Sequence, residues 1–529
     1  MTSLESLGLP STAVPLVIAP VALSSAHSTQ TFPQYILFAY AEKHRASPDS
    51  KQSTSSFNQD LIPYLFEKSF SSVPQELEQY LAPYPVLPPQ VHSTSHKHHH
   101  YHQDLSTSSH THSAQSNNTT SKPIETDTDA LPRHLKYLTI INSTTSGTHR
   151  SSEIYFAILA PLLNRFGVSH VYVATSSKTS VKTHAQSFTD PSTVVLLSGD
   201  TSVSEFINCL GTPEHQLQPL CLLVIPTGTG NALANSCGLS SIPIAISRLF
   251  LGNPKPLANL FVEFPPGSHT GSDQDESSSD NDRPSSSCST VVDRSGSAGS
   301  SDTAVTDLGS SSALTFYAIA IVSWAVHASL VADSDSPAYR TLGSTRFQKA
   351  AEENLARPQR YRGTVTLGVD STLDVIKPPS KQIKAPYTLD HDHAYLLFSL
   401  VSKIEKTYTI SPNSNPPSAC ELHVVHTDYT SNEDLLAMMM APYTDGAFFK
   451  LGDNVQYYNL RYKTSNNAQP SRDSQPGPLA AQVWPGESNP TYQRWCLDGV
   501  TVHVPANAGP VKIHLPTYVA HGWTLNLVT

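Results

Sequence analysis

The chain has little charge, no long apolar run and no cysteine framework, and each shortage excludes a class of protein. Only 14% of the 529 residues are charged, against roughly 25% in ordinary globular chains. The formal net charge of −10 argues against a nucleic-acid binder that works through a broad basic surface. No stretch approaches the ~18 apolar residues of a transmembrane segment. The six cysteines are scattered without a CxxC pair, which favours reduced thiols in a cytoplasmic protein.

Uncharged polar residues and 41 prolines replace the missing charge, and they gather in stretches with neither helical nor strand periodicity. These stretches are too polar to offset the entropy lost on ordering, so we interpret them as linkers and inserts. They are a low-complexity His/Ser/Thr linker at 91–134, an acidic, serine-rich insert at 265–312 and a polar loop at 464–487. Residues 1–90 remain as an N-terminal accessory segment, for which the sequence indicates no chemistry.

The first linker contains a dense histidine cluster in SHKHHHYHQ at 95–103. Its imidazoles could chelate a soft divalent metal ion, but low-complexity sequence offers no fixed ligand geometry. We therefore favour a solvated linker here and assign no metal ligand in the chain. The histidines concerned are His96, His98, His99, His100 and His102.

The remaining sequence predicts two folded domains with a cleft between them. In the first, residues 135–260, apolar runs alternate with helical stretches, which is typical of an α/β domain with a parallel sheet covered on both faces. In the second, residues 313–529, strand-like runs dominate and predict an antiparallel β-sandwich. The apolar runs of the first domain lie at 137–141, 170–174, 193–197 and 221–225, and its helical stretches at 151–166, 203–210 and 231–239.

Three strand-to-helix junctions of the α/β domain carry the residues expected to do chemistry. The sequence IPTGTGNALANS at 225–236 follows a strand and opens a helix, so Gly228 and Gly230 can turn the backbone N–H groups toward an anion. Similar junctions lie at 196–210 and 142–147. Because ligands bind at the carboxyl ends of parallel strands, we expect the three loops to form one phosphate site. It lacks the Walker pattern GxxxxGK[ST].

Asp200 follows the strand of the second junction, and a carboxylate there can accept a hydroxyl proton or help to organise Mg²⁺ beside phosphates. The alternative is helix capping. Ser202 and Glu205 have the S-x-x-E spacing of a capping box, which alone could explain both residues. For Glu205 the two interpretations remain open.

These motifs resemble the lipid-kinase family that contains diacylglycerol, sphingosine and ceramide kinases, which shares its two-domain fold with NAD kinase. The resemblance covers roughly 135–260 and 313–525. The family's SGDG motif stands here as Ser198-Gly199-Asp200, followed by Glu205 and Asn208, and its GTGN motif occupies 228–231. The NALA ending at 231–234 and the segment SWAVHASLVADSDSPAYRTLGSTRF at 323–347 are most similar to sphingosine kinases.

The resemblance assigns roles position by position. Asp200 corresponds to the catalytic residue, as a base or as the group that orients the attacking hydroxyl. Asp333, with Asp335 as the alternative two residues away, corresponds to the acid that meets the lipid head group. Arg340 and Arg346 correspond to cations that neutralise the transferred phosphoryl group. The remaining residues implied to bind nucleotide are Asn142, Thr179, Ser198, Gly199, Glu205, Gly228, Thr229, Gly230, Asn231 and Asp498.

The activity implied is that of an ATP- and Mg²⁺-dependent lipid kinase acting on a hydroxyl of a sphingoid base or a diacylglycerol-type lipid. Such a substrate implies a cytoplasmic protein with transient, peripheral contact to a membrane surface. No nucleic acid, transmembrane segment or protein partner is indicated. TDGAFF at 444–449 and CLDGV at 496–500 resemble the two D-G turns of the family.

Two residues depart from the family pattern. Val500 replaces the glutamate of a D-G-E turn, which removes one polar group near the phosphates. Thr201 stands where the family has glycine, and a β-branched residue resists positive φ and adds bulk. A catalytically impaired lipid- or nucleotide-binding regulator of the same fold is therefore one alternative. A kinase of a soluble substrate, similar to NAD kinase, is the other.

Overall fold

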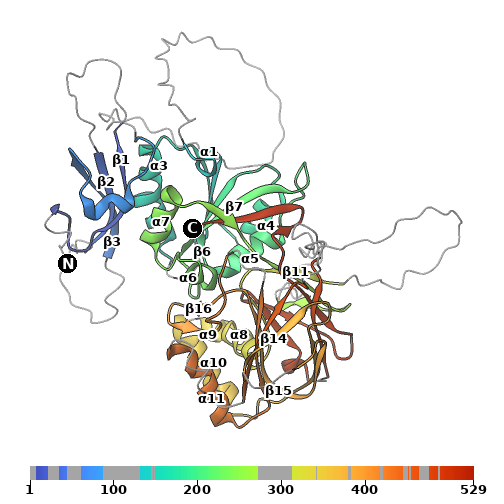
Figure 1. The fold of residues 1–529 in the computed structure, drawn as a ribbon. Coiled ribbons are helices and arrows are strands. Elements are labelled where there is room, and N and C mark those ends of the chain that lie inside the picture. Colours follow the sequence, from blue (N-terminus) through green and yellow to red (C-terminus); the bar gives the residue numbers. More distant parts are fainter. Residues whose placement is uncertain are drawn as a thin grey trace, which may run out of the picture.

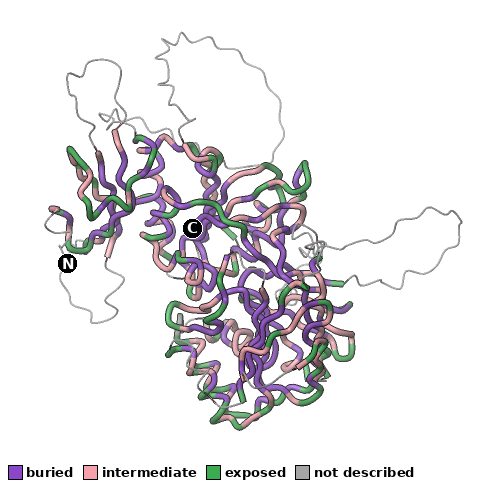
Figure 2. Tube along the Cα trace, viewed as in Figure 1, coloured by how far each residue is buried: buried purple, intermediate pink, exposed green. Residues whose placement is uncertain are grey.

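The computed structural model shows an N-terminal sheet, an α/β domain beside it and a larger antiparallel region below (Figure 1). Buried residues follow the strands at the centres of the sheets (Figure 2). No helix within the described residues is long and apolar enough to cross a bilayer. The structure describes residues 7–21, 35–44, 61–86, 131–144, 147, 149–177, 179–271, 313–340, 342–378, 383–417, 421–444, 451, 454–463, 476–486 and 489–529.

The N-terminal sheet consists of three antiparallel strands, and both of its faces are buried. One face packs against the α/β domain, where Phe38 and Tyr84 contact Phe166 in an aromatic cluster. The hydroxyl of Tyr84 also donates to the carbonyl of Phe250 at 2.5 Å. The accessory segment of the sequence analysis therefore shares a core with the α/β domain. Its elements are β1 (Val14–Pro20), β2 (Tyr35–His44), β3 (Leu61–Phe70) and the 3-10 helix η2 (Gln75–Tyr80).

The α/β domain contains the expected parallel sheet, in the order β7-β6-β4-β5. Strands β4 and β6 are buried along their whole length because helices cover both faces. The strands are β4 (Leu138–Asn142), β5 (His170–Ala174), β6 (Thr193–Ser198) and β7 (Gln218–Pro226). The helices are α1 (Arg133–Lys136), α2 (Ser151–Ile154), the π-helix η4 (Tyr155–Leu159), α3 (Ala160–Arg165), α4 (Ser180–Gln186), α5 (Asp200–Asn208), α6 (Ala232–Ser236) and α7 (Ile242–Leu251).

The last strand of the chain belongs to this sheet, which corrects the expectation that residues 313–529 form one β domain. Strand β25 (Trp523–Val528) pairs in parallel with β7 (Figure 1), and β24 (Val519–Ala520) and β8 (Pro254–Pro256) pair with its other side. Trp523 is fully buried there. A short apolar strand has the same pattern in either kind of sheet, so tertiary packing chooses its partner.

The antiparallel region is built around one hydrogen-bonded sheet, in the order β10-β22-β21-β12-β15-β13-β20-β23-β9-β11, with β18, β19 and β14 joined through β15. All its pairings are antiparallel, as predicted, but a two-sheet sandwich is not confirmed. The strands are β9 (Leu260–Glu263), β10 (His269–Thr270), β11 (Thr315–Ala318), β12 (Ile321–Ala325), β13 (Tyr361–Leu367), β14 (Thr372–Lys377), β15 (Tyr387–Ser399), β18 (Leu422–Asp428), β19 (Val455–Arg461), β20 (Leu479–Pro485), β21 (Arg494–Leu497), β22 (Val500–His503) and β23 (Val511–His514).

Helices and a small hairpin flank this sheet on the side below α6 (Figure 1). The hairpin joins the two regions, since the Ser236 hydroxyl donates to the Lys403 carbonyl at 3.0 Å and accepts from the Lys403 amide at 2.9 Å. The elements are α8 (Val326–Ser334), α9 (Pro337–Arg340), η6 (Gly343–Thr345), α10 (Arg346–Leu355), β16 (Lys403–Glu405), β17 (Tyr408–Thr409), α11 (Asn432–Met440), η7 (Ala441–Thr444) and η9 (Pro490–Tyr492).

Parts of the expected linkers are regular structure. Strand β20 lies within the expected polar loop 464–487 and pairs with β13 and β23. Helix α1 overlaps the end of the 91–134 linker, and β10 lies inside the 265–312 insert. Strand β20 adjoins a long polar run that obscures its apolar pattern, whereas α1, with 4 residues, and β10, with 2, are too short to show one. The histidine cluster at 96–102 and the acidic run of the insert lie outside the described residues.

Candidate active site

The three strand-to-helix loops of the α/β domain meet at one edge of the sheet. Strands β4, β6 and β7 end side by side, with Asn142 opposite Leu197 and Ser198 opposite Pro226. A Cβ atom on Gly228 would lie 2.3 Å from the Cα atom of Gly199. Such an approach excludes any side chain at Gly228, because the backbones of the two loops are already in contact. This glycine is therefore required by loop packing.

The GTGN loop is closed by its own asparagine. Asn231 adopts the left-handed conformation, with φ 60° and ψ 47°, which asparagine tolerates better than most residues. Its side chain donates to the Gly228 carbonyl at 2.7 Å and accepts from the Gly228 amide at 3.2 Å. Thr229 is exposed, and a Cβ atom on Gly230 would meet nothing closer than an Asp200 oxygen at 3.8 Å. The outer face of the loop therefore has open space.

Asp200 is the first residue of α5, and its carboxylate connects two of the loops. One oxygen accepts from the Ala232 amide at 2.5 Å and the other from the Leu233 amide at 3.1 Å, both at the start of α6. Burial raises the pKa of Asp200, although these amides favour the charged form. The backbone amides of Asp200 and Asn231 contribute further hydrogen bonds, so the backbone fixes this carboxylate in place.

The capping-box interpretation of Ser202 and Glu205 is wrong. Helix α5 begins at Asp200 with Gly199 as its N-cap, so both residues lie inside the helix. The Glu205 carboxylate instead accepts from the backbone amide of Lys182 in α4. Burial raises the pKa of Glu205 to about 7. Because the N-cap residue Gly199 has no side chain to cap α5, N–H groups in the first turn of α5 are available to an anion.

Asp498 brings the antiparallel region to the same edge. It and Gly499 form the turn between β21 and β22, with φ 49° and 89°, as expected for an Asp-Gly hairpin. Its carboxylate accepts from three backbone amides between β11 and β12, at 2.7, 3.0 and 2.9 Å. Burial raises its pKa to about 7, and the nearby charge of Asp200 contributes to the shift. The candidate site therefore lies between the two folded parts.

The structure explains both departures from the family pattern locally. Thr201 is the second residue of α5 and is not among the described residues with positive φ. The expected backbone strain is therefore absent, although its hydroxyl lies 2.9 Å from where a Cβ atom on Gly499 would be. Val500 opens β22 opposite Leu497 and packs against the apolar core.

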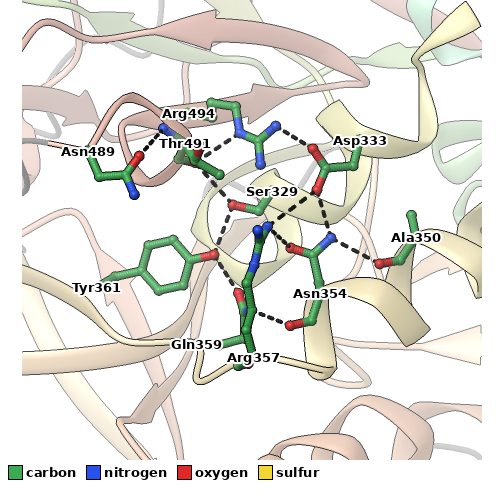
Figure 3. A network of polar contacts seen from close by, with 10 residues as sticks. All are labelled: Ser329, Asp333, Ala350, Asn354, Arg357, Gln359, Tyr361, Asn489, Thr491 and Arg494. Atoms are coloured by element: carbon green, nitrogen blue, oxygen red, sulfur yellow. Dashed lines mark hydrogen bonds and ion pairs between the residues drawn. The ribbon is translucent and has the colours of Figure 1, made fainter.

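Asp333 is a residue of α8 and belongs to a network of polar side chains (Figure 3). Its carboxylate pairs with Arg494 at 2.5 Å and Arg357 at 3.9 Å. It also accepts from the Asn354 side chain at 2.8 Å. Asp335 is more exposed and lies 3.4 Å from Arg346. The exposed fraction of the Asp335 side chain is 44%, against 29% for Asp333, so Asp335 is the more accessible of the two to an added ligand.

Asp335 and Asp498 both act on the Cys496 thiol. Burial raises the pKa of this thiol to about 12, and the charges of Asp498 and Asp335 contribute to that shift. The side chain of Arg340 and residues 445–450, which hold most of the TDGAFF motif, lie outside the described residues.

Asn142 and Thr179, both expected to bind nucleotide, differ in their surroundings. Asn142 is fully buried, and its side-chain amide donates to Ser152 at 2.9 Å and to the Tyr172 hydroxyl at 2.8 Å. It therefore holds α2 against β5 beneath the loop. Thr179 is the exposed residue that precedes α4.

Asn208 has a joining role that sequence reasoning did not assign. Its side chain donates to the Tyr317 carbonyl at 2.9 Å and accepts from the Tyr317 amide at 2.8 Å. These bonds fix α5 to β11. The E-x-x-N motif contains Asn208, but local spacing does not reveal its partner, which lies 109 positions away in the sequence.

Comparison with known proteins identifies the domain that holds this edge. Residues 136–260 match the family model of the diacylglycerol kinase catalytic domain. The three loops that carry Asn142, Asp200 and Gly228 thus lie in the part of the chain that is similar to this domain. A 75-residue part is 43% identical to sphingosine kinase B of Dictyostelium discoideum. That match covers 14% of this chain and 10% of the relative.

Solved structures from Bacillus anthracis str. Sterne resemble a larger part of the chain. One, described as a diacylglycerol kinase, has a TM-score of 0.41 and 10% identity, and covers 74% of this chain and 96% of its own. Another structure from the same organism, described as a putative diacylglycerol kinase, has a TM-score of 0.45 and 11% identity. It covers 74% of this chain and 97% of its own.

Proposed function

We propose that this chain is an ATP-dependent lipid kinase that phosphorylates a hydroxyl of a sphingoid base or a diacylglycerol-type lipid. The observation that carries the proposal is the position of Asp200, where the loops of the kinase domain and the Asp498 turn meet. We place its activity in the cytoplasm, with transient contact to a membrane surface that presents the lipid.

The site fits a nucleotide triphosphate with Mg²⁺. The first turn of α5 and the GTGN loop offer backbone N–H groups, and the space beside Gly230 leaves room for phosphate oxygens. Asp200 would help to organise Mg²⁺ beside the phosphates. When bound, the metal would neutralise phosphate charge. Arg346 would add a cation from the antiparallel side.

Asp200 would orient the lipid hydroxyl and accept its proton. The amides of Ala232 and Leu233 fix the carboxylate, so little reorganisation is needed when the hydroxyl attacks. Burial raises the pKa of Asp200, which makes its carboxylate a stronger base than an exposed one. Asp335 would contact the polar head group, because its side chain is more exposed than that of Asp333.

Phosphate transfer from labelled ATP to sphingosine, phytosphingosine, ceramide and diacylglycerol in mixed micelles tests the proposal. We expect one lipid class to be labelled, and Asp200→Asn to lower the rate by about 10²–10⁴-fold. Asp190→Asn, an exposed aspartate before β6, is the matched control and should retain activity. Labelling that Asp200→Asn does not reduce would contradict the assigned role.

The impaired regulator remains the second candidate, because Val500 offers no proton acceptor where the family has one. It predicts that ATP raises the melting temperature of the protein while no lipid is labelled. Restoring Val500→Glu would then increase transfer. If NAD instead competes with ATP and becomes labelled, the acceptor is a soluble nucleotide and the lipid assignment is wrong.

A further inference from the structure

A group of histidines lies in the antiparallel sheet, away from the candidate active site. His391 and His393 are alternate residues on β15, and His426 lies on the neighbouring strand β18. One ring nitrogen from each lies within 4.8 Å of those of the others. Alternate residues of a strand point to the same face, so the spacing H-x-H on one strand and H-x-D on the next is the signal for this arrangement.

Asp428 completes the group as a fourth donor. One of its carboxylate oxygens contacts His391 Nε2 and lies 3.7 Å from His426 Nε2. The Gln456 side chain donates to the other oxygen at 3.1 Å. That hydrogen bond orients the carboxylate toward the histidines, as outer partners do in metal sites.

The tautomer of His393 leaves a lone pair directed into the group. His393 Nε2 lies 3.0 Å from the Gly363 carbonyl, which can only accept, so Nε2 carries the proton. Its Nδ1 then presents a lone pair toward His426 Nε2, 2.8 Å away.

We propose that His391 Nε2, His393 Nδ1, His426 Nε2 and Asp428 Oδ1 bind a transition-metal ion of the Zn²⁺ type. Imidazole nitrogens suit Zn²⁺ better than Mg²⁺ or Ca²⁺, which prefer oxygen. Tetrahedral ligands about 2.0–2.1 Å from zinc lie about 3.4 Å apart. His426 Nε2 lies 2.8 Å from His393 Nδ1 and 3.7 Å from Asp428 Oδ1, on either side of that value. Movements of the side chains would therefore complete the site.

The site is accessible and independent of the proposed kinase chemistry. A cavity of about 630 Å³ reaches His391 and gives an ion a route from solvent. His393 and Ser399 are six residues apart on β15, which is about 20 Å at ~3.3 Å per residue. Ser399 precedes Leu400, which donates to Ala320 beside Asp498. The ion would tie β15 to β18, at the point where their pairing register shifts.

Zinc binding by the full-length protein tests the inference. The linker histidines at 96–102 are a competing site, so the background carries serine at His96, His98, His99, His100 and His102. After chelator treatment, this protein is titrated with Zn²⁺ against a chromophoric chelator. We expect one tightly bound ion per chain and a higher melting temperature, because the ion binds only the folded state. Co²⁺ should give the intense visible absorption of tetrahedral coordination.

His391→Asn is the decisive variant, since this exposed side chain can be replaced without disturbing the core. It should weaken Zn²⁺ binding at least 100-fold and leave the melting temperature of the metal-free protein unchanged. Asp428→Asn should weaken binding about tenfold. His215→Asn, at an exposed histidine outside the group, should bind Zn²⁺ like the background. If the background binds no ion tightly, or if His391→Asn binds like His215→Asn, the cluster is a hydrogen-bonded pair of rings and the inference is wrong.

Discussion

The candidate active site and the interior of the antiparallel sheet both bury titratable groups, but burial shifts the pKa values of the two sets of groups in opposite directions. At the carboxylate edge, formed by Asp200, Glu205 and Asp498, burial raises each pKa while backbone amides hold the oxygens. In the histidine interior, formed by His393, His423 and His426, burial lowers each pKa. Loop ends and helix starts supply unpaired N–H groups for carboxylates, whereas the N–H groups of strands bond to neighbouring strands and are not available to buried side chains.

The largest effect should follow from removing a carboxylate that the backbone encloses. Asp498→Ala leaves the amides of Ile319, Ala320 and Ile321 buried without an acceptor. At roughly 1–3 kcal/mol for each unsatisfied group, we expect the free energy of unfolding to fall by about 4 kcal/mol. Urea denaturation measures it. Asp190→Ala, which is exposed, should change stability by less than about 0.5 kcal/mol. Equal effects of the two variants would remove the distinction between the regions.

Acid should separate the two regions by the sign of their pH dependence. Burial lowers the pKa of His423 from 6.5 to about 4. Between these two values the imidazole is protonated in the unfolded chain and neutral in the folded chain. Stability is then lost as the pH falls, by about 3 kcal/mol at pH 4. Asp498 acts oppositely: its pKa is raised from 3.8 to about 7, so stability is lost as the pH rises through that window.

Denaturation between pH 4 and 7 in the presence of a chelator compares these slopes. His423→Phe should weaken the loss of stability in acid, whereas Asp498→Asn should strengthen it, because each removes one of the opposing contributions. The Phe variant loses the hydrogen bond between His423 and the Tyr457 hydroxyl at every pH, so only the slope is diagnostic. Slopes that shift in the same direction would contradict the assignment.

Two glycines of one loop should respond differently to the same substitution. Gly228→Ala places a Cβ atom 2.3 Å from Gly199, and such overpacking should cost about 2 kcal/mol. Gly230→Ala meets nothing within 3.4 Å and should keep its stability. It should still weaken ATP binding, because its methyl group enters the space assigned to phosphate. Thermal unfolding with and without ATP measures both effects. An ATP-induced shift that Gly230→Ala leaves intact would argue against phosphate in this space.

The smallest effect is expected at Thr201, where the sequence predicted backbone strain. Thr201 is helical and not strained, so Thr201→Gly should lower stability by about 0.5 kcal/mol through helix propensity alone. Lipid phosphorylation should change by less than a few-fold. A large gain in activity would show that the threonine side chain, rather than its backbone, obstructs the site.

The sequence predicted the parallel sheet and the position of its loops because these follow from local rules. Apolar runs between helical stretches indicate parallel strands, and the carboxyl ends of such strands meet at one edge. The same rules place Asp200, Gly228 and Asn231 at that edge. The capping role considered for Glu205 is wrong, because the S-x-x-E spacing is present but lies inside the helix. The loop expected at 464–487 contains strand β20, because the short apolar pattern of this strand lies beside a polar run.

Sequence alone determined the glycine motifs of the α/β domain and the loops that carry them, since each lies within one strand-turn-helix unit. Only the tertiary structure decided that Asp498 faces Asp200, that β25 returns to the α/β sheet, and that His391 lies beside His426. These pairs are far apart in the chain. Which strand lies beside which is set by packing and register, and a one-residue shift would point every side chain of a strand to the other face.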